Sequence, residues 1–373
     1  MRIALVTTTF SIGGAEKQVR DLASVFSQQG HQVLIVSLKG ETQQEIPDGV
    51  ELIELHGKKS LVGLVGIVWR LAAALRNWKP DVVHGHMVVA NILSRIACLR
   101  SRSVVVVSRA HSVDEGGGDL RILAYRLTDR LADMTTNASQ HAVNNYLKRK
   151  ASKPGKICVA SNGVDFDKYK FSPVKREILR KEFEISSEAL LCLAVGRLVD
   201  AKDYPTLIDA FAKVVDVLPI AKLIIVGSGP MKDFLQQKIE ILGISKSIQL
   251  IGMRTDIPEL MSAADLFVLS SAWEGAPLVT IEALACQLPI VATDCGGVAD
   301  NLNGFGSLVS VGDSAMLAEG IVDELRLKRV RTDSVLVEAR RNAKARFSLA
   351  AVGNRWIYLY KILYSHKMGL NIR

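Results

Sequence analysis

Two glutamates, Glu274 and Glu282, follow a strongly apolar segment of the chain. We predict a strand at Leu266–Leu269, so that Glu274 lies in the turn after it and Glu282 lies inside the next helix. A carboxylate only accepts hydrogen bonds, and it therefore suits ligands with pairs of hydroxyl groups, such as ribose or a sugar ring. Pro277 is suited to the first turn of that helix, where free N–H groups can face phosphate oxygens. The two carboxylates could thus bracket the phosphates of such a ligand, and Glu282 among apolar neighbours is otherwise hard to explain.

Two cations, Arg197 and Lys202, follow another predicted strand, Leu190–Val195. An arginine can grip phosphate oxygens through two hydrogen bonds, and a lysine adds a point charge. Together they could neutralise a diphosphate at the carboxyl end of this strand. The sequence leaves an alternative open, in which both side chains are solvated surface cations.

A paired-glycine turn, Gly13-Gly14, follows the first predicted strand and opens a helix. Glycines let the backbone approach a ligand closely, and a helix N-terminus offers N–H groups to an anion. The same pair could be an ordinary tight turn. Because the G-x-G-x-x-G pattern is absent, the sequence does not indicate a standard dinucleotide site.

Three histidines lie near predicted strand ends. His111 follows an apolar strand predicted at Val104–Val107, and we expect its side chain to reach the ligand-binding edge of the sheet. His84 and His86 could be a metal pair, but no carboxylate or cysteine completes a site, so we predict core or hydrogen-bonded histidines. Asp165-Phe166-Asp167 has the spacing of a metal-binding motif, yet it directly follows a turn and is interpreted as a turn and linker. The sequence therefore predicts no metal site.

These residues lie close to short apolar runs that alternate with segments of helical periodicity. Runs that are apolar on both faces and separated by helices indicate parallel sheets covered on both sides. Ligands bind beyond the carboxyl ends of the strands in such sheets. The predicted strands are Ile3–Val6, Val33–Val36, Leu52–Leu55, Val82–His84, Val104–Val107, Ile157–Ala160, Leu190–Val195, Leu223–Val226, Ile248–Ile251, Leu266–Leu269, Ile290–Ala292 and Leu308–Val309.

The alternation breaks at a polar, charged segment around residues 167–187, which indicates two domains. We predict an α/β fold with two doubly wound, Rossmann-like domains at residues 1–168 and 169–350, facing each other across one cleft. Residues 351–373 are predicted to form a C-terminal helix that crosses back toward the N-terminal domain and packs across the hinge.

The chain has 373 residues and a formal net charge of +9. A chain of this length can bury a hydrophobic core, so small disulfide-stabilised scaffolds and disordered tails are excluded as protein classes. The basic excess favours anionic partners without choosing among them. Five cysteines without a C-x-x-C pair fit a reducing compartment, and the most apolar segment, residues 61–75, is too short to span a bilayer. The N-terminal apolar run is also too short for a signal peptide, so we expect a cytoplasmic protein.

Taken in order, these features resemble the retaining glycosyltransferases of family 4 (glycosyl transferases group 1), which have the GT-B fold. Each match is weak alone, but the order and spacing are specific. The Trp273-Glu274-Gly275 version of the last motif is similar to bacterial enzymes that build lipopolysaccharide, capsule or exopolysaccharide. The matching features are Gly13-Gly14, His111, Asn162-Gly163-Val164-Asp165, Gly196-Arg197-Leu198 with Lys202, Leu250-Ile251-Gly252, Ala264-Asp265 with the strand after it, and Glu274-x7-Glu282.

The resemblance implies a role for each matching residue. Arg197 and Lys202 would hold the diphosphate of a nucleotide-sugar donor and stabilise the leaving nucleotide. Glu274 would hold hydroxyls of the transferred sugar, so that Arg197, Lys202 and Glu274 are the catalytic candidates. The backbone of residues 252–254 would frame the base, and Glu282 would hold the ribose. The donor-binding candidates are Gly13, Gly14, His111, Gly252, Met253, Arg254, Gly275, Ala276, Leu278 and Glu282.

The resemblance also implies a reaction and its partners. A hexose or N-acetylhexosamine would pass, with retention of configuration, from a UDP-sugar or GDP-sugar to a glycan or a polyprenyl-diphosphate-linked acceptor. The N-terminal domain would be the acceptor side and the C-terminal domain the donor side. The family needs neither a cofactor nor a divalent metal. Domain closure would exclude water and limit hydrolysis of the donor.

Two positions depart from the family pattern. Pro277 stands where many members have glycine, which removes one backbone donor near the phosphates. Asp300 stands where a glutamate is commoner, and no catalytic role is assigned to it.

Two other functions remain alternatives. A sugar-nucleotide 2-epimerase of the same fold would turn over without an acceptor, and the Glu274-x7-Glu282 pattern argues against it. A basic nucleic-acid binder would need clustered cations with exposed aromatic residues, whereas only 6% of the chain is aromatic and its charge is dispersed. We therefore expect no nucleic-acid partner.

Residues 58–79 suggest a further partner, an anionic membrane surface. This stretch combines apolar residues with Lys58, Lys59, Arg70 and Arg76, and it contains two tryptophans. On a helix it could lie at the membrane interface, close to a lipid-linked acceptor. A long core helix of the first domain explains the same stretch equally well.

Overall fold

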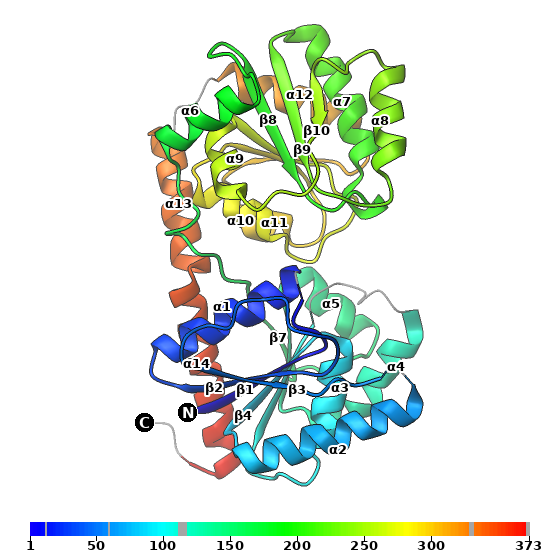
Figure 1. Cartoon of the computed structure of the whole chain (residues 1–373), viewed down its shortest axis with the longest axis vertical. Helices are drawn as coiled ribbons and strands as arrows, with labels where there is room; N and C mark the ends of the chain where they lie inside the picture. The colour runs from blue at the N-terminus through cyan, green and yellow to red at the C-terminus, as the bar shows by residue number, and fades with distance from the viewer. Residues whose placement is uncertain (12, 59, 111–117, 328–331, 371–373) are drawn as a thin grey trace. The chain divides into compact units, whose positions relative to one another are not determined.

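The computed structural model of the chain describes residues 1–11, 13–58, 60–110, 118–327 and 332–370. The chain forms two compact units, Met1–Gly163 with Leu349–Arg373 as unit 1 and Val164–Ser348 as unit 2 (Figure 1). The change of unit falls slightly before the predicted boundary, because Val164 pairs with Ser348 in a short parallel bridge and its N–H donates to the Phe347 carbonyl at 2.8 Å. Both units are parallel sheets flanked by helices, which confirms the predicted fold class.

Unit 1 is built on a seven-stranded sheet with the strand order β3-β2-β1-β4-β5-β6-β7. Every pair of neighbouring strands is parallel. The strands are β1 (Arg2–Thr7), β2 (Gln32–Ser37), β3 (Val50–Glu54), β4 (Val82–His86), β5 (Val105–Arg109), β6 (Met134–Asn137) and β7 (Ile157–Val159). The helices are α1 (Gly14–Gln28), α2 (Leu61–Trp78), α3 (Val88–Ala97), α4 (Gly118–Thr128), η1 (Asp129–Leu131), α5 (Gln140–Lys148) and α14 (Leu349–Met368).

The last helix, α14, completes the core of unit 1 although it follows the whole of unit 2 in the chain (Figure 1). Its residues Trp356 and Tyr360 are buried with the apolar side chains of β1 and α1. The Tyr360 hydroxyl lies 2.7 Å from Nδ1 of His84, and the His84 ring lies 4.4 Å from the Trp356 ring, centroid to centroid, at a tilt of 45°. His84 and His86 are both fully buried, as predicted for core histidines. The predicted C-terminal helix therefore exists, and the structure packs it within unit 1.

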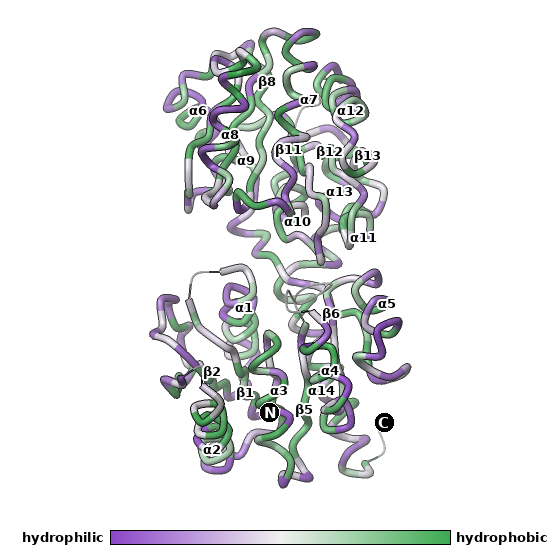
Figure 2. Tube along the Cα trace, turned by 90° about the vertical axis from the view of Figure 1, so that its right-hand side faces the viewer, coloured by the Kyte–Doolittle hydropathy of each residue, from purple (hydrophilic) through white to green (hydrophobic). Residues whose placement is uncertain are grey.

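Unit 2 is built on a six-stranded parallel sheet with the order β10-β9-β8-β11-β12-β13. Figure 2 shows its central strand β8 as hydrophobic over most of its length, as expected for a strand buried on both faces. The strands are β8 (Leu190–Val195), β9 (Ala221–Val226), β10 (Ile248–Leu250), β11 (Leu266–Leu269), β12 (Ile290–Thr293) and β13 (Ser307–Val309). The helices are α6 (Pro173–Glu182), η2 (Asp200–Lys202), α7 (Tyr204–Val217), α8 (Lys232–Ile241), α9 (Ile257–Ala263), α10 (Leu278–Ala285), α11 (Val298–Leu302), α12 (Ser314–Arg326) and α13 (Ser334–Phe347).

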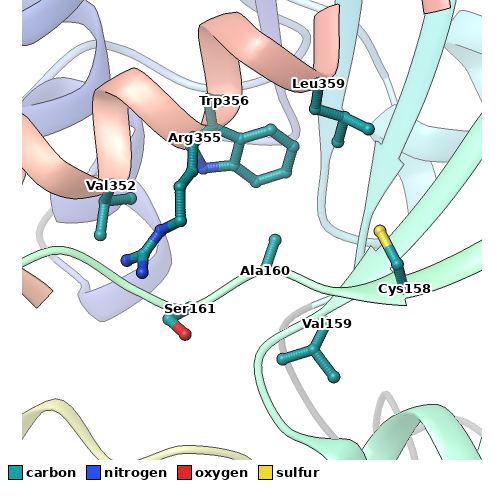
Figure 3. Close-up of a pocket in the computed structure, with 8 residues that line it drawn as sticks. All are labelled: Cys158, Val159, Ala160, Ser161, Val352, Arg355, Trp356 and Leu359. Atoms are coloured by element: carbon teal, nitrogen blue, oxygen red, sulfur yellow. The ribbon is translucent and has the colours of Figure 1, made fainter. Parts of the chain in front are cut away.

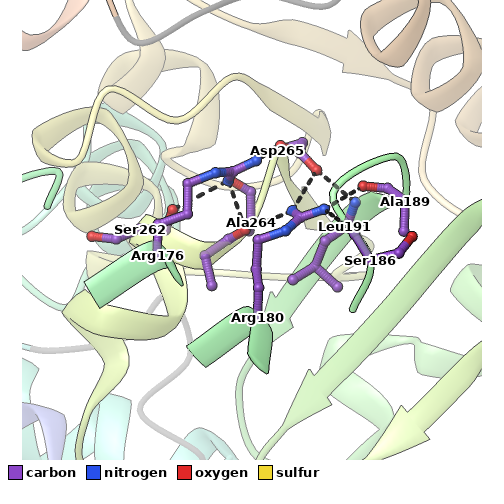
Figure 4. A network of polar contacts seen from close by, with 9 residues as sticks. Arg176, Arg180, Ser186, Ala189, Leu191, Ser262, Ala264 and Asp265 are labelled. Carbon is purple, nitrogen blue, oxygen red and sulfur yellow. Dashed lines mark hydrogen bonds and ion pairs between the residues drawn. The ribbon is translucent and has the colours of Figure 1, made fainter. Parts of the chain in front are cut away.

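The polar segment at which we predicted the domain boundary forms helix α6, and ion pairs hold this helix against the sheet (Figure 4). Arg176 and Arg180 both pair with Asp265, at 2.5 and 3.2 Å. Asp265 also accepts a hydrogen bond from the Leu191 N–H at 2.7 Å, at the start of β8. The side chain of Arg180 is almost fully buried. Asp265, which belongs to a matched family motif, therefore acts at the amino end of the sheet and holds the fold together.

Helix α2 is a core helix on one face, with Ile67, Leu71 and Leu75 buried against the sheet of unit 1. Trp78 is buried too, and its indole N–H donates to Glu51 at 2.9 Å. The expectation that this tryptophan lies at a membrane interface is therefore wrong. None of the helices in the described part of the chain has the length and hydropathy that crossing a bilayer requires.

Candidate functional site

The sheet order of unit 2 fixes where a ligand site is expected. From β8 the chain builds outward through β9 and β10, and it then returns to place β11 on the other side of β8. The gap between the loops after β8 and β11 is thus a topological switch point, where open α/β sheets bind ligands beyond the carboxyl ends of their strands. Arg197 and Lys202 follow β8, and Glu274 follows β11.

Lys202 and Glu274 form an ion pair at this switch point. Lys202 ends the short helix η2, and Glu274 lies in the loop between β11 and α10. Their side chains are only 18% and 14% exposed, so the pair is largely shielded from water. The Ser271 hydroxyl donates to the same carboxylate oxygen at 2.8 Å. The structure therefore brings together two of the three predicted catalytic residues.

Hydrogen bonds tie the two loops to each other and to the sheet. The Ser270 hydroxyl donates to the Lys202 carbonyl at 2.8 Å, and the Thr293 hydroxyl donates to the Ser271 carbonyl at 2.6 Å. Ser270, Ser271 and Thr293 are all buried. Sequence reasoning missed these three residues, since their importance follows from the pairing of β11 with β8 and with β12 and not from a motif. Small hydroxyl side chains at the carboxyl ends of apolar strands are the signal that could have found them.

Two glycines let neighbouring backbone approach the site loops. Gly296 has a φ of +55°, and a Cβ atom on it would lie 1.8 Å from the Glu274 carbonyl oxygen. Gly227 has a φ of +149°, and a Cβ atom there would lie 1.9 Å from the Gly196 carbonyl oxygen. A side chain at either position would displace the loop that carries Glu274 or the loop that carries Arg197.

Arg197 differs from Lys202 in its surroundings. Its side chain is exposed at the carboxyl edge of the sheet. The next residue, Leu198, is buried, and its N–H donates to the Ser228 carbonyl at 2.9 Å. The loop is therefore fixed beside an arginine that remains accessible to a ligand.

Glu282 is only 5% exposed, in helix α10. The helix begins after Pro277, whose carbonyl accepts hydrogen bonds from the Thr280 hydroxyl and the Asn301 side chain. Leu278 is the first residue of the helix, and Gly275 and Ala276 lie in the partly buried loop before it. The N–H groups of a first helical turn have no partner within the helix, so this turn can receive an anion.

The segment after β10 places Gly252 with a φ of +74° and leaves Met253 exposed. Arg254 is held by Asp256 at 2.6 Å and by Glu182 at 3.0 Å. These hydrogen bonds, the one to Asp256 first, raise the pKa of Arg254. The side chain of Arg254 is therefore committed to structural ion pairs, which leaves the backbone of this segment and the exposed Met253 for a ligand.

Unit 1 has its own switch point between β1 and β4. Gly13 caps helix α1, and Gly14 is its first residue. A Cβ atom on Gly13 would lie 2.5 Å from Oε2 of Glu16, and the other carboxylate oxygen, Oε1, accepts from the Thr9 hydroxyl at 2.9 Å. Sequence reasoning missed Glu16, whose charge at this turn favours a hydroxyl group over a phosphate. His111 lies outside the described residues, so its role stays a prediction.

No group of three or more histidine, cysteine, aspartate or glutamate side chains with the arrangement of a metal site occurs in the described ranges. The Asp165-Phe166-Asp167 segment, which has the spacing of a metal-binding motif, forms a turn. In this turn the Asp165 carboxylate accepts hydrogen bonds from the N–H groups of Asp167 and Lys168 at 2.9 Å.

Both halves of the chain are similar to known proteins. Residues 12–168 match the family described as Glycosyltransferase Family 4, and residues 175–343 match Glycosyl transferases group 1. The chain is 28% identical over 303 residues to an Escherichia coli protein, UDP-Gal:alpha-D-GlcNAc-diphosphoundecaprenol alpha-1,3-galactosyltransferase, covering 77% of this chain and 73% of the relative. It is 25% identical to the lipopolysaccharide core biosynthesis glycosyltransferase LpsE of Rhizobium meliloti, covering 86% and 88%.

The fold is also that of solved glycosyltransferase structures. The structure of Anabaena HepE in complex with UDP superposes with a TM-score of 0.83 at 25% identity, covering 97% of this chain and all of that one. The two matched family regions together span most of the chain, one in each unit. The chain is therefore a glycosyltransferase of family 4, glycosyl transferases group 1, with the GT-B fold.

Proposed function

We propose that this glycosyltransferase moves a hexose or N-acetylhexosamine from a UDP-sugar to a glycan or polyprenyl-diphosphate-linked acceptor in bacterial surface-polysaccharide synthesis. The observation that carries the proposal is the meeting of Lys202 and Glu274 at the switch point of unit 2. A cation suits the diphosphate, and a carboxylate suits sugar hydroxyls. A UDP complex of HepE and the diphosphoundecaprenol acceptor in the name of the E. coli relative support the classes of donor and acceptor.

The chemistry follows from where negative charge develops. When the bond between the sugar's anomeric carbon and the β-phosphate oxygen breaks, its electron pair stays on the phosphate. Lys202, the exposed Arg197 and the first turn of α10 can stabilise that charge. Glu274 would orient the transferred sugar through its hydroxyls. We propose retention of configuration and no requirement for a divalent metal, both from the family resemblance.

A donor and acceptor screen tests the proposal. The purified protein would be incubated with UDP-glucose, UDP-galactose, UDP-N-acetylglucosamine, UDP-N-acetylgalactosamine or GDP-mannose, together with a short-chain prenyl-diphosphate-linked sugar. We expect a UDP-sugar to be consumed only when acceptor is present, with NMR of the product reporting the anomer. The same turnover in EDTA would support metal independence. Conversion of the donor into another nucleotide sugar without acceptor would instead identify an epimerase.

We also propose that α2 rests on an anionic membrane surface, next to a lipid-linked acceptor. Opposite its buried face, the helix leaves Val62, Val65 and Trp69 exposed, at 84%, 59% and 69%. Arg70 and Arg76 are exposed on the same helix. Apolar side chains flanked by cations are the chemistry of a helix lying in the interface of an anionic bilayer.

A further inference from the structure

Unit 1 contains a pocket of about 240 Å³ that none of the roles above explains (Figure 3). It lies where β7 ends against α14, at the carboxyl edge of the sheet, where ligands of parallel sheets bind. Cys158 and Ser161 line it from the strand side, and Arg355, Trp356 and Leu359 line it from the helix. Figure 3 shows Arg355 and Ser161 toward one end of the pocket, and Cys158 and Leu359 toward the other.

The described lining of the pocket includes a cationic side chain. Of the described residues that line it, Arg355 is cationic and none is acidic. A second guanidinium, that of Arg109, lies behind the wall over the Trp356 ring at 5.4 Å. Arg109 is almost completely buried and donates to the Ala160 carbonyl and to the Asn162 side chain, both at 2.7 Å. Both of these acceptors are uncharged.

The lining of the pocket is partly apolar, and the pocket itself is small. Trp356, Leu359 and Val352 offer apolar surface beside the arginine. A volume of this size is below the roughly 300–1,000 Å³ of sites that take drug-sized ligands. It therefore fits a phosphate group and the first few carbons attached to it better than a whole nucleotide sugar.

We propose that this pocket binds a phosphate ester with an apolar chain, at the junction between the phosphate and the lipid carrier of the acceptor. Arg355 and the Ser161 hydroxyl would contact the phosphate, and Trp356 and Leu359 would contact the first carbons of the chain. This inference rests on the proposed function, since it concerns the lipid-linked acceptor. It adds a binding site in unit 1 that is separate from the donor residues of unit 2.

The rate at which the Cys158 thiol is alkylated can report whether the pocket is occupied. Cys158 is half-buried and lines the pocket, whereas Cys98, Cys192, Cys286 and Cys295 are buried. Burial raises the pKa of the Cys158 thiol, with the nearby Arg109 acting in the opposite direction. Alkylation is therefore best measured above pH 8, where more thiolate is present. The labelled residue would be identified by mass spectrometry.

The experiment measures the alkylation rate of Cys158 in the full chain with saturating UDP, so that the probe cannot act through the donor site. The probes are geranyl diphosphate, geraniol and inorganic pyrophosphate. At ten times the dissociation constant, geranyl diphosphate should slow labelling about ten-fold by mass action. Geraniol should give no protection, and pyrophosphate should protect only at much higher concentration. Equal protection by pyrophosphate would show a general phosphate site and overturn the lipid-carrier assignment.

Variants separate binding in the pocket from general effects. Arg355→Glu and Arg355→Gln should both abolish protection by geranyl diphosphate, and Arg355→Lys should partly restore it. Lys361→Glu, an equal charge change at an exposed position of the same helix, should behave as wild type. Protection that survives in Arg355→Glu, or that geraniol also produces, would overturn the proposal.

A kinetic arm distinguishes failure of this inference from failure of the proposed function. Arg355→Gln should raise the KM for a prenyl-diphosphate-linked acceptor and leave the affinity for UDP unchanged. If the KM for acceptor does not change while UDP still binds and transfer proceeds, the pocket has no part in acceptor binding. If the wild-type protein binds no UDP, the proposed donor itself is wrong.

Discussion

Lys202 and Glu274 neutralise each other across the loops that follow two adjacent strands, β8 and β11. Under the proposed function, a donor diphosphate that binds Lys202 would compete with this carboxylate and release Glu274 for the hydroxyls of the sugar. We propose that the pair links recognition of the phosphates to recognition of the transferred group.

Glu274→Gln should separate those two effects. Removing the competing charge should tighten binding of UDP by about 3- to 10-fold, the equivalent of about 1 kcal/mol. Transfer should nevertheless fall at least about 100-fold, because the amide no longer orients the sugar as the carboxylate does. Isothermal titration with UDP and a turnover assay would measure both. Weaker UDP binding in Glu274→Gln would contradict the competition.

Lys202→Ala should abolish transfer and lower UDP affinity by about 10- to 100-fold, as expected for loss of a charge-assisted hydrogen bond to phosphate. The melting temperature should fall only modestly, because Lys202 ends the short helix η2 outside the core, although Glu274 loses its partner. Lys213→Ala, an exposed lysine on α7, is the matched control and should be fully active. A fully active Lys202→Ala enzyme would remove the basis of the site assignment.

Asp265→Ala should destabilise unit 2 by about 2–4 kcal/mol, because it leaves Arg176 and the nearly buried Arg180 without their carboxylate. The free energy of unfolding from a denaturant titration would measure the loss. Asp209→Ala breaks a more exposed pair with Lys238 and should cost less than about 1 kcal/mol. Similar losses of unfolding free energy in the two variants would show that the ion pairs of Asp265 with helix α6 do not stabilise unit 2.

The pair between Arg254 and Asp256 should make stability depend on acidity. The hydrogen bond from Arg254 holds the pKa of Asp256 below its ordinary value. A carboxylate with a depressed pKa adds stability above its unfolded pKa, and this stability is lost as the pH falls through its folded pKa. Asp256→Asn should therefore be less stable than wild type at pH 7, and the difference should shrink below about pH 4. A difference that stays constant down to pH 2.5 would contradict this assignment.

Vesicle co-sedimentation tests the membrane surface on α2. Charge reversal at Lys58, Lys59, Arg70 and Arg76 should release the protein from phosphatidylglycerol vesicles, since each cation near such a surface contributes about 1 kcal/mol. Trp69→Ser should weaken binding as well. Phe234→Ser, an exposed aromatic residue of unit 2, should bind as wild type. Binding that is unchanged after charge reversal would show that α2 does not contact the membrane.

Most of the fold could be predicted because the strands are apolar on both faces. The exception is β6, where Thr135, Thr136 and Asn137 are buried in the sheet without an apolar run. Thr135 accepts a hydrogen bond from the buried Arg95 at 2.9 Å, so its polar character is satisfied by a residue far away in the chain. Hydrophobic patterning has no access to such a partner.

The candidate site was predictable to a similar degree. Lys202 and Glu274 follow strands that the sequence identifies, and a parallel sheet brings the carboxyl ends of those strands to one edge. The hydrogen bond from Thr293 to the Ser271 carbonyl and the close approach of Gly296 to Glu274 depend on which strands are neighbours. Strand order is a property of the whole sheet, and local sequence does not encode it.

The order of synthesis gives the packing of α14 a further consequence. Unit 2 is continuous in the chain. Unit 1, by contrast, needs helix α14, which is translated only after the whole of unit 2. While the ribosome is still making that helix, Phe26 and Val107 lack the cover that Trp356 and Tyr360 later provide. Unit 1 therefore finishes folding after unit 2. During that interval it carries an exposed apolar face, to which chaperones could bind.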